Sequence, residues 1–279
     1  MAFSVNTNAG AMAALQSLNA TNNKMDVTQS RINTGLAVSS TKDDSAKYTI
    51  AQTLRGDLGG LSAVTSSLNN AKSVTDTAIA GAEQISDLLN QMKSKAYEAA
   101  DAGLDADSRT AIDKDFTALK EQISTIIESS EFNNTNLLDS AFTGTTSVAA
   151  LQSLKVATGT DTLDVANQSF DTAVYDVIDA SDVSSQANAE AMVATIDTVI
   201  STVNTSLSDL GAASRKIEGQ QSFTSKLSDV VTAGIGNLVD ADLAKESANL
   251  QALQVQQQLG VQALSIANQA PQTILSLFR

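Results

Sequence analysis

The feature that most constrains the fold is a long run of apolar residues at alternating steps of three and four. Thr75 is the one polar member of this run: Leu61, Val64, Leu68, Ala71, Ala78, Ala82, Ile85, Leu89, Met92 and Ala96. This spacing places the side chains on one face of an α-helix. It predicts a single helix from about residue 47 to residue 100, on the order of 80 Å long. A helix of that length argues against a compact enzyme.

A turn and further helices follow this run. The stretch DAGLDADSR at residues 101–109 predicts a turn, in which Asp107 or Ser108 can cap the next helix. That helix carries five apolar residues on one face: Ile112, Phe116, Leu119, Ile123 and Ile126. Helical spacing returns from residue 189 to residue 231, which predicts a second long helix that returns beside the first.

The segment from about residue 140 to residue 188 differs from the rest of the chain. It is rich in Ser, Thr and Asp and lacks helical spacing. Four apolar residues alternate around a glycine-containing turn: Leu154, Val156, Leu163 and Val165. This pattern predicts a β-hairpin. We therefore expect a mainly α protein, a rod-like bundle of long antiparallel helices with a small β-hairpin insertion.

Both ends of the chain are free of charge. Every charged side chain except Arg279 lies between Lys24 and Glu246, although 17% of all residues are charged and the net charge is −14. The surface of a monomer normally carries Lys and Glu. Uncharged outer faces therefore favour burial against copies of the same chain over an ordinary internal bundle. Glutamines 254 and 256–258 can form hydrogen bonds there without the desolvation cost of an ion.

The two ends also carry apolar seams typical of a coiled coil. At the N-terminal end the three-four spacing joins Leu15, Leu18, Met25, Ile32 and Leu36. Asn22 and Gln29 occupy the intervening seam positions. At the C-terminal end the seam and a second apolar stripe comprise Leu243, Leu250, Leu253, Val255, Leu259, Val261, Leu264, Ile266, Leu275 and Leu277. A helix with two apolar stripes needs partners on more than one side, so we expect these residues to pack both within the coiled coil and between subunits.

Composition excludes several classes of function. The chain has no Cys and no His, so it can hold neither a Ser-His-Asp triad nor a zinc site of the usual type. Its acidic balance opposes binding to nucleic acid and to anionic membranes. The amides of residues 259–277 argue against a membrane span. The first residues lack the basic and apolar regions of a Sec signal, so we expect no cleaved signal peptide.

Two short motifs favour structural roles over chemistry. GIGNLV at residues 234–239 lacks the third glycine of a nucleotide fingerprint and is interpreted as a helix hinge. DADSR begins like a calcium loop but places Arg109 where a ligand is needed, so a capped turn is expected. No cofactor and no metal are predicted, and no constellation of Asp, Glu, Ser and Lys suggests an enzyme.

Three blocks of the sequence resemble bacterial flagellin. SVNTNAGAMAALQSLN and RINTGLAVSSTKDDSAKYTIAQTLRGDLGGL are similar to its N-terminal signatures. NLVDADLAKESANLQALQVQQQLGVQALSIANQAPQTILSLFR is similar to its C-terminus almost position by position. The resemblance covers nearly the whole chain outside about residues 140–188, and it indicates a short form without large outer domains.

The resemblance implies the function and location of the chain. It implies a structural subunit that polymerises into the extracellular flagellar filament, a rotating helical propeller for swimming. It also implies type III export, an export chaperone, and contact with the junction and cap proteins associated with the hook. O-linked glycans on exposed Ser and Thr are a further hypothesis. The close alternative is a hook–filament junction protein, and an enzyme is the alternative from another class.

The resemblance further implies how the chain is divided. Residues 1–41 and 237–279 correspond to a discontinuous inner domain of the filament core, and residues 42–236 to an outer helical domain with the β insertion. Four residues near the first boundary are candidates for polar contacts between subunits: Arg31, Lys42, Asp43 and Asp44. The two aspartates either open a helix or form an ion pair between subunits.

Overall fold

A computed structural model describes residues 7–142, 146–153 and 162–277, with side chains up to residue 269. The chain divides into two compact units. The terminal unit comprises residues 1–58 and 230–279, and the long-helix unit comprises residues 59–229. The predicted inner segments 1–41 and 237–279 fall within the terminal unit.

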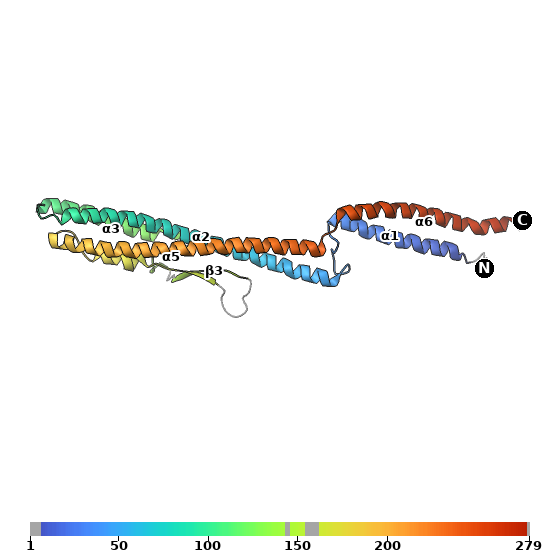
Figure 1. Ribbon diagram of the computed structural model, residues 1–279, viewed down its shortest axis with the longest axis horizontal. Coiled ribbons are helices and arrows are strands. Elements are labelled where there is room, and N and C mark those ends of the chain that lie inside the picture. The colour runs from blue at the N-terminus through green and yellow to red at the C-terminus, as the bar shows by residue number, and fades with distance from the viewer. Residues whose placement is uncertain (1–6, 143–145, 154–161, 278–279) are drawn as a thin grey trace. The chain divides into compact units, whose positions relative to one another are not determined.

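Two antiparallel helices dominate the terminal unit: α1 (Ala9–Thr34) and α6 (Leu243–Leu277) lie side by side (Figure 1). The side chain of Asn8 caps α1 by accepting a hydrogen bond from the Ala11 N–H. Gly35 ends α1 in the left-handed conformation, with φ of 72°, which glycine adopts without a Cβ penalty. These signals fix the length of α1 between residues 8 and 35.

A short backbone bridge joins the two chain connections of the terminal unit. The N–H groups of Ala37 and Val38 donate to the Val239 carbonyl, at 2.7 and 3.2 Å, and the Ala241 N–H donates to the Gly35 carbonyl at 2.9 Å. Leu36 and Asp240 pair across this bridge in antiparallel fashion. A small apolar cluster of Val38, Ala51 and Val239 is buried beside it. We call residues 35–38 and 239–241 the connection bridge.

Three long helices form the long-helix unit. They are the part of α2 (Ser45–Ala99) after residue 58, α3 (Ala106–Ser129), and the part of α5 (Gln186–Val239) before residue 230. The predicted run on α2 is confirmed, because all of its members from Leu61 to Ala96 are buried, Thr75 included. The Thr75 hydroxyl donates to the Ala71 carbonyl of its own helix at 2.8 Å, so its methyl group packs without an unsatisfied donor.

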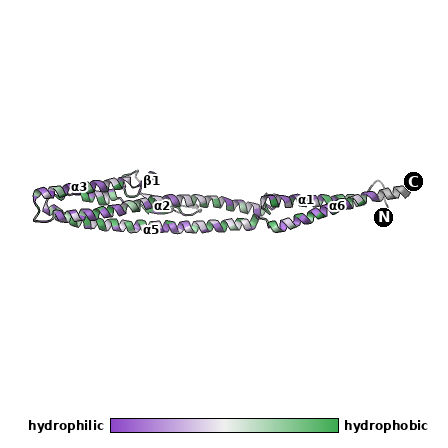
Figure 2. Cartoon of the chain, turned by 90° about the horizontal axis from the view of Figure 1, so that it is seen from above, coloured by the Kyte–Doolittle hydropathy of each residue, from purple (hydrophilic) through white to green (hydrophobic). Residues whose placement is uncertain are grey.

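The core of this unit combines the three helices. Figure 2 shows hydrophobic and hydrophilic residues interspersed along the whole length of each helix, as expected for helices that bury one stripe and expose the other. Among the largest fully buried side chains are Leu68, Leu89 and Met92 on α2, Phe116 and Ile123 on α3, and Met192 and Ile196 on α5. The mainly helical class predicted from the sequence is confirmed.

Two small antiparallel hairpins follow α3. The first pairs β1 (Glu131–Phe132) with β2 (Thr135–Asn136), and the second pairs β3 (Ser147–Leu151) with β4 (Thr162–Ala166). The predicted strand containing Leu163 and Val165 is thus confirmed. Its partner is β3 instead of the segment with Leu154 and Val156, and those two residues lie outside the described residues.

The segment after the second hairpin is partly helical, which the sequence did not predict. A π-helical turn, η1 (Asp171–Tyr175), continues into α4 (Asp176–Asp179). Phe170, Val174 and Ile178 repeat every four residues and are fully buried. Three apolar residues in a polar segment are too few to stand out as helical spacing, and their burial against the long helices stabilises these turns.

Two other local predictions are wrong. Asp105 caps α3, with its Oδ1 accepting from the Ser108 N–H at 2.6 Å, so neither Asp107 nor Ser108 is the cap. The helix α5 continues through Gly234 and Gly236 to Val239, so there is no hinge at these glycines. The 48 residues of α5 that precede Gly234 continue the helix despite the roughly 1 kcal/mol cost of each glycine.

Candidate functional site

The contact between α1 and α6 is a regular antiparallel seam. Each helix contributes seven positions at alternating steps of three and four, and these are the less exposed positions of each helix. On α1 they are Ala11, Ala14, Leu18, Thr21, Met25, Thr28 and Ile32. On α6 they are Glu246, Leu250, Leu253, Gln257, Gly260, Leu264 and Ala267. Only Thr28 and Glu246 among these fourteen described residues are fully buried, so the seam is narrow.

The structure places some of the predicted seam residues on this seam and others elsewhere. Those on the seam are Leu18, Met25, Ile32, Leu250, Leu253 and Leu264. Leu15, Leu243 and Val261 are exposed, as are Val255, Leu259 and Ile266 of the second stripe. Leu36 packs against the apolar cluster at the connection bridge. Leu275 and Leu277 lie outside the residues whose side chains are described.

Threonine takes the place predicted for one of two amides. The sequence placed Asn22 and Gln29 on the seam. Gln29 is exposed and Thr28 occupies its place, whereas Asn22 is half-buried beside Thr21 and contacts Gln257 of α6. The Thr21 hydroxyl donates to the Ser17 carbonyl at 3.0 Å, so this side chain meets α6 with its methyl group. A threonine whose hydroxyl bonds within its own helix can occupy a seam position. A search for large apolar residues at heptad spacing does not detect such a position.

Three polar contacts join the two terminal helices. Gln257 Nε2 donates to Asn22 Oδ1 at 2.8 Å, and Asn8 Nδ2 donates to the Ala267 carbonyl at 2.7 Å. Arg31 Nη1 and Glu246 Oε1 form an ion pair at 3.1 Å, in which the Glu246 side chain is only 11% exposed. Arg31, predicted to contact another subunit, therefore has its ionic partner within its own chain.

The connection between α1 and α2 is ordered by two aspartates. One oxygen of Asp43 accepts hydrogen bonds from the backbone and hydroxyl groups of both Ser39 and Ser40, at 2.9 to 3.1 Å. Asp44 opens α2 by accepting from the N–H groups of Ala46 and Lys47. The helix-opening role considered for this pair is thus present at Asp44. Lys42 is exposed beside them.

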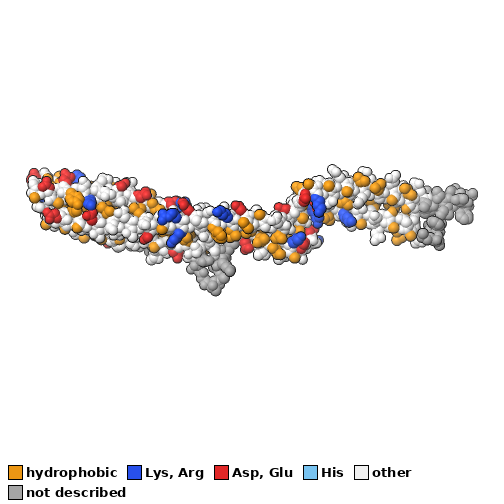
Figure 3. Space-filling view, in the orientation of Figure 1, with side chains coloured by type: hydrophobic (Ala, Val, Ile, Leu, Met, Phe, Trp, Pro, Cys, Tyr) orange, Lys and Arg blue, Asp and Glu red, His pale blue; other side chains and the backbone are white. Residues whose placement is uncertain are grey.

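The outward faces of the terminal helices combine large apolar and uncharged polar side chains over most of their length, and the exposed charges Lys24, Asp26 and Lys245 lie in the halves nearest the connection bridge. Among the described residues, fifteen large apolar side chains are exposed, and ten of them belong to the terminal unit. On α6 they include Val255, Leu259 and Ile266, which are 55%, 59% and 65% exposed. Figure 3 shows that the face over α1 and α6 is orange and white for most of its length. Such a surface is typical of a contact with another protein.

Charge is divided unequally between the two units. The terminal unit has seven basic and seven acidic residues, and the long-helix unit has ten basic and twenty-four acidic ones. The entire net charge of −14 therefore belongs to the long-helix unit. Copies of the neutral terminal unit can approach one another without the repulsion that copies of the long-helix unit would experience.

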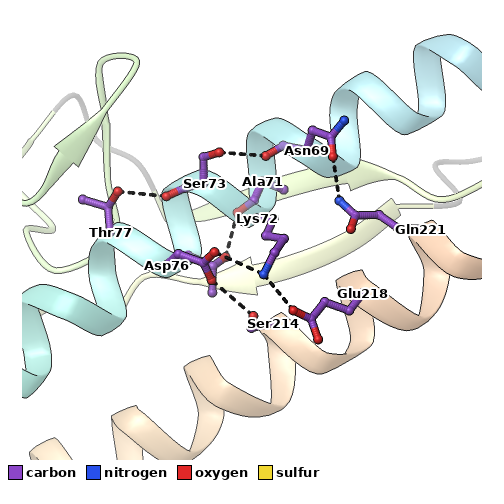
Figure 4. Close-up of polar contacts among 10 residues, drawn as sticks. Asn69, Ala71, Lys72, Ser73, Asp76, Thr77, Ser214, Glu218 and Gln221 are labelled. Carbon is purple, nitrogen blue, oxygen red and sulfur yellow. Dashed lines mark hydrogen bonds and ion pairs between the residues drawn. The ribbon is translucent and has the colours of Figure 1, made fainter.

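Polar contacts in the long-helix unit align α2 with α5 (Figure 4). Lys72 Nζ lies 2.8 Å from Glu218 Oε1 and 3.1 Å from Asp76 Oδ2. Ser214 donates to Asp76 one turn of α5 away from Glu218. Gln221 Nε2 donates to Asn69 Oδ1 at 2.9 Å. The hydrogen bonds to Glu218 and Asp76 raise the pKa of Lys72. These contacts hold two helices in register and form no reactive pair.

Neither metal-ligand clusters nor membrane-spanning helices appear in the described part of the chain. Among residues 7–142, 146–153 and 162–277, no group of three or more Asp, Glu, His or Cys side chains could hold a metal ion. No helix within these ranges is long and apolar enough to cross a membrane.

Comparisons with known proteins match both ends and nearly the whole length of the chain. The family described as the bacterial flagellin N-terminal helical region matches residues 5–143, and the bacterial flagellin C-terminal helical region matches residues 193–278. Flagellin FljK of Caulobacter vibrioides is 42% identical over 99% of this chain and 98% of its own length. The chain belongs to the bacterial flagellin family. A flagellin of Brucella melitensis is 37% identical over 99% of both chains.

Solved structures of two related proteins share the fold of this flagellin. A flagellin of Bacillus cereus matches with a TM-score of 0.50 and 23% identity, over 56% of this chain and 86% of that one. A putative flagellar hook-associated protein of Vibrio parahaemolyticus matches with a TM-score of 0.59 and 16% identity, over 71% of this chain and all of that one. At these identities the similarity concerns the fold alone. The near-complete matches to flagellins favour a filament subunit over a junction protein.

Family membership defines the general role of the chain. Flagellins are structural proteins and not enzymes, so this flagellin is a structural subunit of the extracellular flagellar filament, where it polymerises with copies of itself.

Acid should lower the folding stability of this flagellin, because three aspartates that accept hydrogen bonds in its connecting segments become protonated. Hydrogen bonds from Ser39 and Ser40 lower the pKa of Asp43, the Ser108 N–H lowers that of Asp105, and Asn188 and Ser184 lower that of Asp182. A carboxylate with a lowered folded pKa contributes stability that is complete above its unfolded pKa, about 3.9, and is lost as the pH falls through the folded pKa.

The measurement is the thermal unfolding midpoint of the secreted chain between pH 6 and pH 2. We expect the midpoint to fall below about pH 4. The triple variant Asp43→Asn, Asp105→Asn and Asp182→Asn should begin lower and fall less steeply over that interval. A variant profile parallel to that of the parent would contradict the assignment.

Lys120 should stabilise the end of the β insertion. It is 8% exposed, its Nζ lies 3.2 Å from Asp179 Oδ1 and 3.3 Å from the Ser181 carbonyl, and the same Nζ lies 5.9 Å from the centre of the Phe116 ring. Lys120→Ala should lower the free energy of unfolding by about 2 kcal/mol, because it removes both the stem and the hydrogen bonds. Lys120→Met keeps the stem and should cost about 1 kcal/mol.

Chemical denaturation of the monomer measures both changes. The control is Lys114→Met on the same helix, where the lysine is exposed, and it should change the free energy by less than about 0.5 kcal/mol. Equal changes in the free energy of unfolding for the substitutions at positions 114 and 120 would show that the contacts of Lys120 do not stabilise the fold.

Proposed function

We propose that this flagellin builds the wall of its filament from the paired terminal helices. In this proposal residues 1–41 and 237–279 form the inner domain, and residues 42–236 form the outer domain. The observation that carries the proposal is the coincidence of exposed apolar side chains and zero net charge in the terminal unit. Apolar faces without charge gain free energy when copies bury them, and they pay no penalty for repeated like charges.

The apolar residues outside the seam act between subunits in this proposal. Val255, Leu259, Val261 and Ile266 on α6, with Leu15 on α1, would contact helices of neighbouring copies. The seam residues would act within each copy. A fully buried apolar side chain contributes roughly 1.5 to 3 kcal/mol, so several half-exposed residues repeated in every subunit are sufficient to favour assembly.

The acidic outer domain would face the medium. Its net charge keeps filaments apart in solution, because surfaces of like charge repel one another. With only the short segment around residues 140–188 in place of larger outer domains, the proposed filament is thin and smooth. It would act as a rotating propeller for swimming.

Export and partners form the finer part of the proposal. The chain would leave the cell through the flagellar type III apparatus without a cleaved signal peptide, escorted by an export chaperone. Junction and cap proteins at the two ends of the filament would contact the same terminal helices.

Modification by O-linked glycans is proposed for the outer surface. Four exposed hydroxyl residues lie in the stretch 195–208 of α5: Thr198, Ser201, Thr205 and Ser208. They belong to the acidic long-helix unit, and not to the terminal helices proposed for assembly. The intact mass of protein sheared from cells tests this point: a mass equal to that of the sequence, 28.9 kDa, removes the proposal.

Electron microscopy of intact and truncated protein tests the assembly proposal. The intact chain should form long tubes, and a chain that ends at Asp240 should form none, because it lacks α6. Circular dichroism of the truncated chain should retain the helices of the long-helix unit. Tubes of normal length from the truncated chain would contradict an assembly role for α6.

A further inference from the structure

The seam between α1 and α6 is compatible with more than one register. Because the helices are antiparallel, the numbers of two seam residues that face each other have a constant sum. In the observed register Met25 faces Leu253, Leu18 faces Gly260 and Ala14 faces Leu264. If α6 slipped by one heptad, Met25 would face Gly260 and Ile32 would face Leu253. In the slipped register large apolar residues would again face either small residues or other large apolar ones. The packing free energy of the seam therefore differs little between the two registers.

Two contacts near the base of the seam fit the observed register alone. The Arg31–Glu246 ion pair would be broken by the slip, because Arg31 would move beside Leu253 and leave the buried Glu246 carboxylate without its partner. Breaking a buried pair in this way is strongly unfavourable. The connection bridge would also be lost, with its hydrogen bonds from Ala37 to Val239 and from Ala241 to Gly35.

These two contacts are adjacent in the chain. Arg31 lies one turn before Gly35, where the bridge begins, and Glu246 lies one turn after Asp242, which opens α6 by accepting from the N–H groups of Ala244 and Lys245. The farther contact between Asn22 and Gln257 lies more than two turns away, where the seam is only half-buried. At the opposite end of the seam, Asn8 donates one hydrogen bond to the Ala267 carbonyl. The end beside the bridge is thus the one where a buried carboxylate in an ion pair and several backbone hydrogen bonds occur together.

We propose that the connection bridge and the Arg31–Glu246 pair are the registration point of the terminal helices. They select one register of α1 against α6, and the rest of the seam pairs outward from them. The slip would also separate Asn22 from Gln257, but these half-buried amides can hydrogen-bond to water instead, so their contact contributes little to the choice of register. This assigns to Arg31 and Glu246 a positioning role within the subunit.

The register matters for assembly, and this step rests on the proposed function of the terminal helices. A slip of one heptad moves α6 by about 10 Å along α1. It would displace Leu259 and Ile266 on α6 relative to Leu15 on α1, so the outward apolar faces would no longer present one common pattern to neighbouring copies. A single register is therefore a requirement for a regular lattice.

Engineered cysteines can report the register, because the natural chain has none. The pair Met25→Cys with Leu253→Cys should form a disulfide within one chain in the observed register. The pair Ile32→Cys with Leu253→Cys should do so only after a slip of one heptad. Both pairs are read in sheared filaments after oxidation. The mass of the intact, undigested product separates bonds within a chain, which leave a monomer, from bonds between chains, which give a dimer or larger species. Peptide mass spectrometry of the monomer then identifies the two cysteines that are joined.

Substitutions that remove the contacts of the registration point test whether they select the register. Ala241→Pro removes one donor of the bridge, and Arg31→Leu with Glu246→Leu replaces the ion pair by apolar residues that pack in either register. In the triple variant we expect the ratio of slipped to native disulfide to rise about tenfold over the parent. The matched control is Asn22→Leu with Gln257→Leu, which should keep the parent ratio within about twofold. If the triple variant does not assemble, the same ratio is read in the secreted chain.

A charge swap provides the second test. Arg31→Glu alone should raise the slipped fraction, and Arg31→Glu with Glu246→Arg should restore the parent ratio. An unchanged ratio in the triple variant, or a larger slip in the Asn22 and Gln257 control, would overturn the registration point. Absence of tubes from the parent chain would instead contradict the proposed function.

Discussion

Leu259→Asp or Ile266→Asp is expected to abolish filament formation and to leave the long-helix unit folded. Both side chains are more than half exposed on α6, outside the seam with α1. A carboxylate there costs the free subunit little. In the filament it would be buried against a neighbour without a counter-ion, a cost of several kcal/mol that every subunit repeats.

Sedimentation and electron microscopy of the purified variants measure assembly, and circular dichroism measures the helices. We expect less than about one-tenth of the parent amount of sedimented tubes, which corresponds to a loss of at least 1.4 kcal/mol per subunit. The control is Gln122→Glu, which adds the same charge at an exposed position of α3 in the acidic unit. Normal tubes from both aspartate variants would remove these residues from the proposed interface.

The second large effect is expected at Gly81, in the middle of α2. A Cβ atom at this position would overlap Ser130 Oγ and lie 2.9 Å from Leu138 Cδ1. Ser130 cannot move aside freely, because it ends α3 and its hydroxyl donates to the Ile126 carbonyl at 2.6 Å. The absence of a side chain at Gly81 therefore lets α2 approach the end of α3 closely.

Gly81→Val should lower the free energy of unfolding of the monomer by about 3 kcal/mol through overpacking, and the thermal midpoint by roughly 6 °C or more. The matched control is Gly59→Val on the same helix, where no atom lies within 4 Å of the new Cβ. That change should alter the free energy by less than about 0.5 kcal/mol, since valine and glycine differ little in helix propensity. A midpoint for the Gly81 variant within 1 °C of its control would contradict the close approach.

The sequence predicted the long helices well because their signal is repeated many times. Ten apolar residues from Leu61 to Ala96 agree on one face, and all ten are buried. The turns around Phe170 and Ile178 have only three such residues, and their helical form depends on tertiary packing that no local pattern contains. The position of β3 was missed for the same reason, because its partner is set by pairing with β4 across a long connection.

The candidate site could be predicted only in part. Leu18, Met25 and Leu253 were found because large apolar residues at heptad spacing are a direct signal of a seam. Thr28 and Glu246 were missed, since a buried threonine or glutamate cannot be told from an exposed one by spacing alone. Arg31 was assigned to a neighbouring subunit because its partner is 215 residues away in the sequence.

Helical reconstruction of the filament by cryo-electron microscopy tests the central claim most directly. The account predicts that α1 and α6 of each subunit line the inner wall and that Val255, Leu259 and Ile266 lie within about 4 to 4.5 Å of side chains from neighbouring copies. It also predicts that most of the acidic long-helix unit faces solvent. A filament in which these three residues face solvent, with subunits joined through the long-helix unit alone, would contradict it.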